Sequence, residues 1–330
     1  MNAPKIIPPP TPTPILAPPT TPAASRAPAV DLDSLFVTGE ASQKGFFVSI
    51  AGPPKYGKST FAAGAPRPFF IMADRNGAES LPRTVRRFIP STWSEILSAL
   101  SALDRASPLP GTVVLDTTFA AESLAIKHLC SSGGKESLRA VGGGYGAGYE
   151  MLTAEIGKVV STFFALNARG VHTIAISQIE TKTVKDPSLD DYERAALALE
   201  KKTSLLWTAS ADVNMFVQPE IRERDRIKGS GDKEDRVKVD FTGRAICHVR
   251  PAAGIEAGNR LFLDSPITYS WAALDIGAAE GAELREALFA KLATLSTADR
   301  AAADWWLNQH GWSLVAARDV LNGIWTQADK

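Results

Sequence analysis

The chain has 330 residues, 45% of them hydrophobic, and its formal net charge at pH 7 is zero, with a pI near 6.9. This length allows one large domain, or one domain with a small appendage. The balanced charge excludes a global attraction to nucleic acid or to an anionic membrane, so any polyanion site must be a local patch. The two cysteines, Cys130 and Cys247, are too few for a disulfide framework and lack the spacing of a zinc site.

Residues 1–38 are expected to form a disordered, proline-rich tail, because residues 1–30 hold ten of the 22 prolines and lack a periodic apolar pattern. We expect the folded core to span residues 39–275 and a small helical appendage to span residues 276–330. A cytoplasmic location is predicted, since no basic-then-apolar signal opens the chain and no run of about 18 apolar residues marks a membrane span.

From Phe46 onward, short apolar runs alternate with helical stretches, a pattern typical of an α/β fold with a mostly parallel sheet flanked by helices. The strands are predicted at 46–52, 68–74, 111–117, 171–178 and 211–217. The helices are predicted after Lys58 and at about 93–104, 118–130, 150–168 and 198–208.

The segment GPPKYGKST matches the pattern G-x-x-x-x-G-K-[ST], with an apolar strand before it and a helix after it. Its backbone amides and the positive end of the helix are suited to phosphate oxygens. Lys58 is expected to hold the β- and γ-phosphates of ATP, and Ser59 to bind Mg²⁺. The predicted nucleotide-binding residues are Gly52, Pro53, Pro54, Lys55, Tyr56, Gly57, Lys58, Ser59 and Thr60.

Three polar residues end predicted strands, at the sheet edge where α/β proteins bind ligands. Asp116 closes the apolar run TVVLD and is the expected carboxylate partner of Mg²⁺. Asp74 ends PFFIMAD and is the candidate for activating the attacking water, with Glu79 in reserve. Gln178 ends VHTIAISQ, where its amide would contact the γ-phosphate.

Residues 219–250 predict a charged β-hairpin around a Gly-Ser-Gly turn. The stretch from Glu220 to Asp240 contains seven basic and seven acidic residues, and this balance favours a solvated ribbon over a DNA-binding one. The helical tail is expected to use its tryptophans as a small core rather than for base stacking; these are Trp305, Trp306, Trp312 and Trp325.

Four segments in order, GPPKYGKST, FIMAD, VVLDT and IAISQIETK, resemble the RecA-like recombinase core. The resemblance covers about residues 46–220. It implies that Asp74 is the catalytic acid, although that family normally has Glu there, and that Gln178 senses the γ-phosphate. More narrowly, the segment GYGAGYE is similar to one in phage-encoded AAA-type nucleotide-binding proteins, some of which anneal single-stranded DNA.

The same resemblance places DNA-binding loops at 131–150 and 179–202. The first contains five glycines around Tyr145 and Tyr149, whose rings offer faces for base stacking. The second carries lysines that could neutralise phosphates, diluted by several acidic residues. The candidate lysines are Lys182, Lys185, Lys201 and Lys202.

RecA-like cores assemble head to tail, so the resemblance implies a ring or filament in which a neighbour's basic residue, such as Arg250 or Arg260, completes the nucleotide site. The leading hypothesis is an ATPase that acts on single-stranded DNA in phage recombination, annealing or repair, in the cytoplasm of the bacterial host. The alternatives are a nucleotide-gated annealing or partner-binding module with little hydrolysis, and a P-loop enzyme with another substrate.

Overall fold

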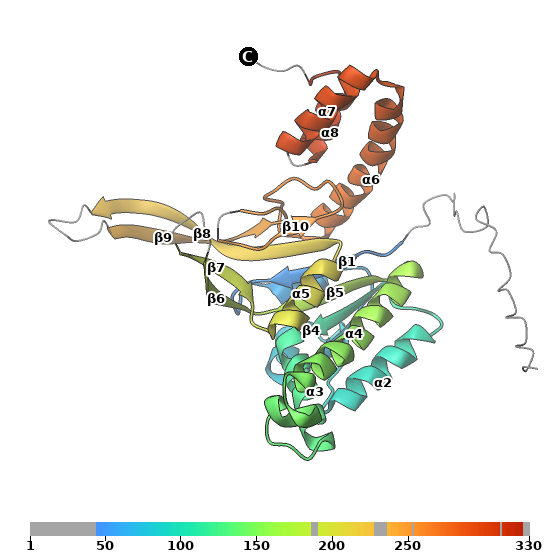
Figure 1. Cartoon of the computed structure of the whole chain (residues 1–330), viewed down its shortest axis with the longest axis vertical. Helices are drawn as coiled ribbons and strands as arrows, with labels where there is room; N and C mark the ends of the chain where they lie inside the picture. Colours follow the sequence, from blue (N-terminus) through green and yellow to red (C-terminus); the bar gives the residue numbers. More distant parts are fainter. Residues whose placement is uncertain (1–43, 186–190, 228–235, 253, 311, 326–330) are drawn as a thin grey trace, which may run out of the picture. The chain divides into compact units, whose positions relative to one another are not determined.

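The structure is a computed structural model that describes residues 44–185, 191–227, 236–252, 254–310 and 312–325. The expected tail at 1–38 lies outside this part of the chain. Within it, eight strands form one sheet in the order β10-β8-β1-β5-β4-β2-β3, and β9 pairs with β8 (Figure 1). The strands are β1 (Phe47–Ala51), β2 (Pro68–Met72), β3 (Arg86–Phe88), β4 (Thr112–Asp116), β5 (His172–Ser177), β8 (Val213–Ile227), β9 (Arg236–His248) and β10 (Gly258–Asn259).

Each neighbouring pair along the path β8-β1-β5-β4-β2-β3 is parallel, whereas β9 and β10 pair antiparallel with β8. Every residue of β1 and of β4 is buried, which explains their continuous apolar runs, because helices cover both faces of such a sheet. This arrangement confirms the expected fold class, a mostly parallel α/β sheet flanked by helices. Since β5 lies between β1 and β4, the carboxyl ends of β1, β5, β4 and β2 follow one another along a single edge.

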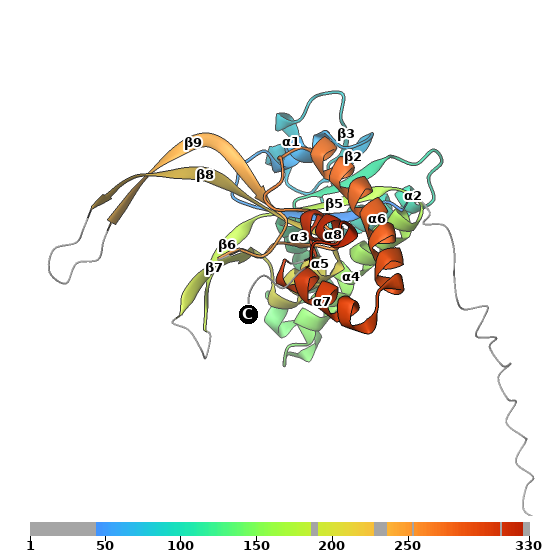
Figure 2. The same ribbon diagram turned by 90° about the horizontal axis from the view of Figure 1, so that it is seen from above.

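Two hydrophobic clusters fill the two faces of the sheet. On one face, residues such as Phe47 and Val113 pack against the helices α2 to α5, and on the other, residues such as Val48 and Val114 pack against α1 and the start of α6. Figures 1 and 2 show these layers. The helices of this core are α1 (Lys58–Ala63), η2 (Arg75–Ser80), α2 (Trp93–Asp104), α3 (Thr118–Ser132), η3 (Leu138–Gly143), α4 (Ala147–Ala168) and α5 (Lys201–Ser210).

Two features differ from the sequence expectation. The expected strand 211–217 and the ribbon after it are one long strand, β8, which pairs with β1 in its first part and with β9 along the rest. The segment expected as a second DNA-binding loop is largely a hairpin of β6 (Ile179–Val184) and β7 (Tyr192–Leu197), joined antiparallel along six residue pairs. The Gly-Ser-Gly turn lies outside the described residues.

The C-terminal part is helical, as expected, and consists of α6 (Trp271–Thr294), α7 (Thr297–Gln309) and α8 (Leu314–Leu321). These helices enclose their own apolar cluster, against which Trp306, Trp312 and Trp325 are partly buried, whereas Trp305 is 48% exposed. Helix α6 begins before the expected boundary at 275/276, because Trp271 stacks on Phe46 of the core. None of the described helices is long and apolar enough to span a lipid bilayer.

Candidate nucleotide site

The P-loop connects the end of β1 to the first turn of α1. Its two glycines are required for different reasons. A Cβ on Gly52 would lie 2.5 Å from the carbonyl oxygen of Val217, so this glycine allows the loop to pack closely against β8. Gly57 has a φ of 71° immediately before α1, in the left-handed region that favours glycine. Lys55 shares that conformation with a φ of 70°. The loop therefore turns back on itself over the end of the sheet.

Lys58 is buried inside this loop, and its Nζ donates hydrogen bonds of 2.7 Å to the carbonyl oxygens of Gly52 and Pro53. Burial lowers the pKa of Lys58 to about 8, against the opposing attraction of Asp116. A buried ammonium needs negative or carbonyl oxygens around it. The Lys58 ammonium is thus held by carbonyl oxygens of the loop, and phosphate oxygens of a bound nucleotide could replace these carbonyl groups as its hydrogen-bond acceptors.

Ser59 and Asp116 are joined directly: the Ser59 hydroxyl donates to Asp116 Oδ2 at 2.5 Å. Burial raises the pKa of Asp116, and the nearby charge of Asp74 adds to that effect, whereas the Ser59 hydrogen bond and the Lys58 charge oppose it. The hydroxyl and the carboxylate are hard oxygen ligands, the class that Mg²⁺ prefers. Within the described residues no group of three or more His, Cys, Asp or Glu could hold a metal ion.

Asp74 and Gln178 line one hollow of about 340 Å³ at the same sheet edge. The Asp74 amide donates to the Asp116 carbonyl oxygen at 3.2 Å, which fixes the backbone of the acid beside the end of β4. Gln178 directly follows β5, the strand between β1 and β4. Glu79, the reserve candidate, lies exposed in η2 and is not among the residues that line this hollow.

Helix α3 supplies lining residues of this hollow that the sequence reasoning missed. Phe119, Ser123 and Lys127 follow one another at intervals of four residues, so they share one face of α3. Thr117 caps that helix by accepting a hydrogen bond from the Ala120 amide. The four-residue spacing of these side chains, directly after Asp116 at the end of a strand, could have predicted from the sequence that this face of the helix lines the site.

A buried carboxylate, Glu122, joins α3 to α5. Its two oxygens accept hydrogen bonds from the Glu200 amide at 3.0 Å and from the Thr203 hydroxyl. The side chain of Glu200, the N-cap residue of α5, makes no capping hydrogen bond, and Glu122 instead fixes the start of this helix through the Glu200 amide and the Thr203 hydroxyl. Glu200 itself is extended, with a ψ of 144°, which is why α5 starts at Lys201 and not at the expected residue 198.

The structure brings four of the six predicted DNA-binding residues together. Tyr145, Tyr149, Lys201 and Lys202 line a pocket of about 400 Å³, which we call the tyrosine–lysine pocket. Tyr145 is fully exposed, and Lys202 forms an ion pair with Glu150. The five glycines around the two tyrosines are required by the backbone conformation. Four of them have positive φ, and a Cβ on Gly148 would lie 2.0 Å from the Leu138 carbonyl oxygen.

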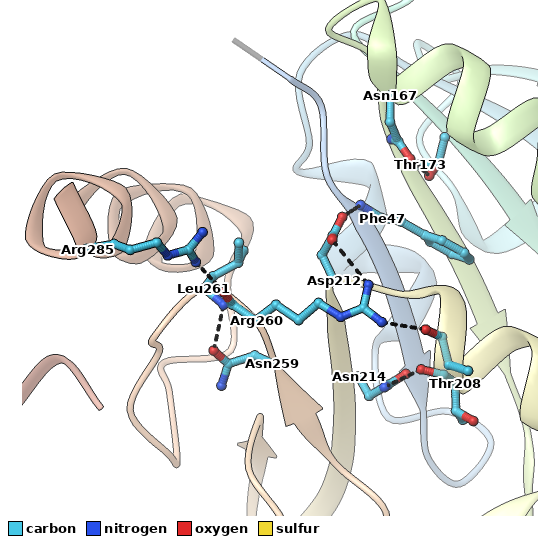
Figure 3. Close-up of polar contacts among 11 residues, drawn as sticks. Phe47, Asn167, Thr173, Thr208, Asp212, Asn214, Asn259, Arg260, Leu261 and Arg285 are labelled. Atoms are coloured by element: carbon cyan, nitrogen blue, oxygen red, sulfur yellow. Dashed lines mark hydrogen bonds and ion pairs between the residues drawn. The ribbon is translucent and has the colours of Figure 1, made fainter. Parts of the chain in front are cut away.

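Lys182 and Lys185 do not line this pocket. Lys182 lies on β6, where it pairs with Glu180 at 2.8 Å, and Lys185 follows the end of that strand. The two arginines considered for a neighbour's site bind within their own chain. Arg260 donates to the Ala209 carbonyl oxygen at 2.7 Å and pairs with Asp212 at 3.9 Å (Figure 3). Arg250 donates to the Leu263 carbonyl oxygen at 2.7 Å.

A protein-family model described as AAA domain (AAA_24) matches residues 44–261, about two thirds of the chain, from just before β1 through β10. The chain belongs to this AAA domain family. The match includes the P-loop, Asp116, Asp74 and Gln178, and it agrees with the RecA-like P-loop NTPase fold class expected from the sequence.

Solved structures similar to this AAA domain chain include the flagellar accessory protein FlaH from Methanocaldococcus jannaschii, with 13% identity and a TM-score of 0.28, covering 64% of this chain and 89% of FlaH. A KaiC-like protein from Pyrococcus horikoshii OT3 has 13% identity and a TM-score of 0.32, covering 62% of this chain and 85% of that protein. A search of curated proteins gave no match.

Proposed function

We propose that the chain binds ATP with Mg²⁺ at the P-loop and hydrolyses it. The observation that carries this proposal is the pair of hydrogen bonds that Ser59 and the Asp74 amide donate to Asp116, beside the buried Lys58, whose charge acts on Asp116. These residues come from three separate segments, and all lie at the carboxyl edge of the parallel sheet. Gln178 faces the same hollow as Asp74.

In this proposal each residue has a distinct task. Lys58 would hold phosphate oxygens and balance the charge that develops on them, while Ser59 and Asp116 would hold Mg²⁺. Bound Mg²⁺ neutralises phosphate charge and orients the triphosphate. Asp74 would orient a water molecule and accept its proton, and Gln178 would contact the terminal phosphate.

The nucleotide assignment is tested by titrating the full chain with Mg-ATP in a calorimeter, beside Lys58→Ala and the exposed control Lys135→Ala. Removing the Lys58 ammonium should weaken ATP binding by at least about tenfold, the order of a charged hydrogen bond. The control should bind like the original chain. Equal affinity for all three proteins would exclude the P-loop as the nucleotide site.

Single-stranded DNA is the partner that we propose for this ATPase, in recombination, annealing or repair. The tyrosine–lysine pocket supports it, because two aromatic rings and two ammonium groups, a set suited to bases and phosphates, line it beside Glu150 and Glu200. Anisotropy of a labelled oligothymidine should report a loss of affinity when Tyr145 and Tyr149 are both changed to Ala. Unchanged binding would remove the pocket from the proposal.

A nucleotide-gated binding module with little hydrolysis is the second candidate function. The short side chain of Asp74 favours it, because the acid reaches less far than the Glu of RecA-like proteins, while its backbone is held at the Asp116 carbonyl. In either candidate, assembly of several copies would let neighbours share the nucleotide site. ATP binding without measurable turnover, together with nucleotide-dependent DNA binding, would select this second function.

A further inference from the structure

The β8–β9 hairpin extends beyond the sheet as a two-stranded arm, and Figures 1 and 2 both show it on the same side as the β6–β7 hairpin. Little of this arm is buried: Ile221 and Phe241, which pair across the two strands, are 53% and 67% exposed. Side chains on an uncovered ribbon contribute little to a core. Their arrangement therefore points to contacts outside the chain.

Three arginines of the arm surround one hollow of about 530 Å³, which we call the arginine hollow. They are Arg222 and Arg224 on β8 and Arg244 on β9, joined in the lining by Asp240, Phe241 and Thr242. Among the described residues that line this hollow, the fold thus brings three guanidinium groups together with one carboxylate.

Asp240 is the carboxylate among the described residues that line the hollow. It lies directly opposite Arg222 in the strand register and pairs with Arg224 at 3.5 Å, and the side chains of Arg224 and Asp240 are both more than half exposed. The neighbouring acid Glu220 accepts a 2.5 Å hydrogen bond from Thr242. Arg222 and Arg244 form no ion pair with any described residue. Within the part of the chain that the structure describes, an external anion would displace no ion-pair partner of these two guanidinium groups.

We propose that the arginine hollow binds the phosphate backbone of single-stranded nucleic acid, and that the exposed Phe241 ring, which the register places with Ile221 on the other face of the arm, stacks on a base of the same strand. Guanidinium groups bind phosphate through paired hydrogen bonds, and an exposed aromatic ring stacks on bases of any sequence. The proposal rests on the single-stranded DNA partner proposed above and adds a contact on a different element from the tyrosine–lysine pocket. An acidic protein would use the arginines but leave the Phe241 ring without a role.

The position of the neighbouring hairpin agrees with this surface. The β7 strand is tied to the segment that follows β9, because the Ala195 amide donates to the Gly254 carbonyl oxygen at 2.8 Å and Arg194 pairs with Glu256 at 3.5 Å. Lys182 of β6 therefore belongs to a hairpin anchored beside the root of the arm. Both hairpins can contribute cationic side chains on one side of the sheet.

The test compares the full chain with Arg222→Gln/Arg244→Gln and with the matched control Arg83→Gln/Arg105→Gln, two exposed arginines outside the hollow. Binding of labelled oligothymidine is followed by anisotropy from low to moderate salt, and melting temperatures verify folding. Loss of two phosphate contacts should weaken binding at least about tenfold and make the slope of log K against log salt shallower by about 1.4. The control should retain both the affinity and the slope.

Further variants separate the contacts. Arg222→Lys/Arg244→Lys should leave the slope of log K against log salt unchanged. Phe241→Ala should lower the affinity for DNA and also leave this slope unchanged. If the hollow variant binds DNA like the original chain while Tyr145→Ala/Tyr149→Ala weakens binding, the hollow is overturned and the DNA partner stands. If the original chain itself fails to bind oligothymidine at low salt, both the proposed DNA partner and the proposed role of the arginine hollow are contradicted. Equal binding of poly-glutamate by the hollow would overturn the nucleic-acid assignment in favour of an acidic protein.

Discussion

The nucleotide site and the arm differ in how they hold charge. At the P-loop, Lys58 is 7% exposed and Asp116 is 3% exposed, and each has partners within hydrogen-bonding distance. On the arm, the side chains of Arg224 and Asp240 are 61% and 57% exposed. Removing one member of a buried set leaves its partners unsatisfied, whereas water replaces a lost partner at the surface. Single substitutions should therefore have large effects at the first site and graded effects at the second.

Among the largest effects is the one expected for Asp116→Ala, which removes the carboxylate partner of both Ser59 and the proposed Mg²⁺. Turnover of ATP should fall by at least about a hundredfold, the scale seen when one electrostatic group is lost from an active site. Phosphate release at saturating Mg-ATP measures this. Asp191→Ala, an exposed acid between β6 and β7, serves as the control and should retain turnover. Full activity of Asp116→Ala would break the contrast between the two regions.

Asp74→Asn should reduce turnover by about 10²–10⁴-fold while ATP binding is retained, because an amide can orient water but cannot accept its proton. Glu79→Gln is the matched control, since Glu79 is exposed and absent from the lining of the hollow. Single-turnover phosphate release beside ATP titration separates the two properties. If Glu79→Gln lost turnover and Asp74→Asn did not, Glu79 and not Asp74 would be the acid that activates the attacking water.

Glu122→Ala is expected to destabilise the fold by about 1–3 kcal/mol, because the Glu200 amide and the Thr203 hydroxyl lose a buried acceptor. Burial raises the pKa of Glu122 in the folded state. Its contribution to stability is thus fully present below the unfolded pKa and declines as the pH rises through the raised folded pKa. Glu122→Gln should remove that decline, and urea unfolding between pH 4 and pH 8 measures it. Parallel pH profiles for Glu and Gln would contradict the assignment.

The smallest effect is expected for Lys202→Ala. Its ion pair with Glu150 is exposed, with 58% and 63% of the two side chains accessible, so unfolding free energy should change by less than about 1 kcal/mol. The salt slope of DNA binding should become shallower by about 0.7, the contribution of one phosphate contact on a single strand. An unaltered slope would remove Lys202 from the DNA contacts.

Each part of the candidate nucleotide site could be predicted from the sequence because each is a short local pattern, although the segments lie far apart along the chain. Buried strands such as TVVLD appear as continuous apolar runs, and a polar residue at the end of each run marks the ligand edge. Glu122 was not readable, since its role depends on the packing of α3 against α5, and an acid within a helix has no distinguishing signal. The arginine hollow was hidden for a similar reason: charges that balance along the chain are sorted only by the cross-strand register of β8 and β9.

The first measurement is ATP hydrolysis by the purified full chain, with and without single-stranded DNA, beside Lys58→Ala. We expect magnesium-dependent turnover that DNA increases and that Lys58→Ala abolishes. Turnover unchanged in Lys58→Ala would contradict the assignment of the P-loop as the catalytic nucleotide site. Turnover that requires Lys58 but does not change when DNA is added would support the ATPase assignment and contradict DNA-stimulated hydrolysis.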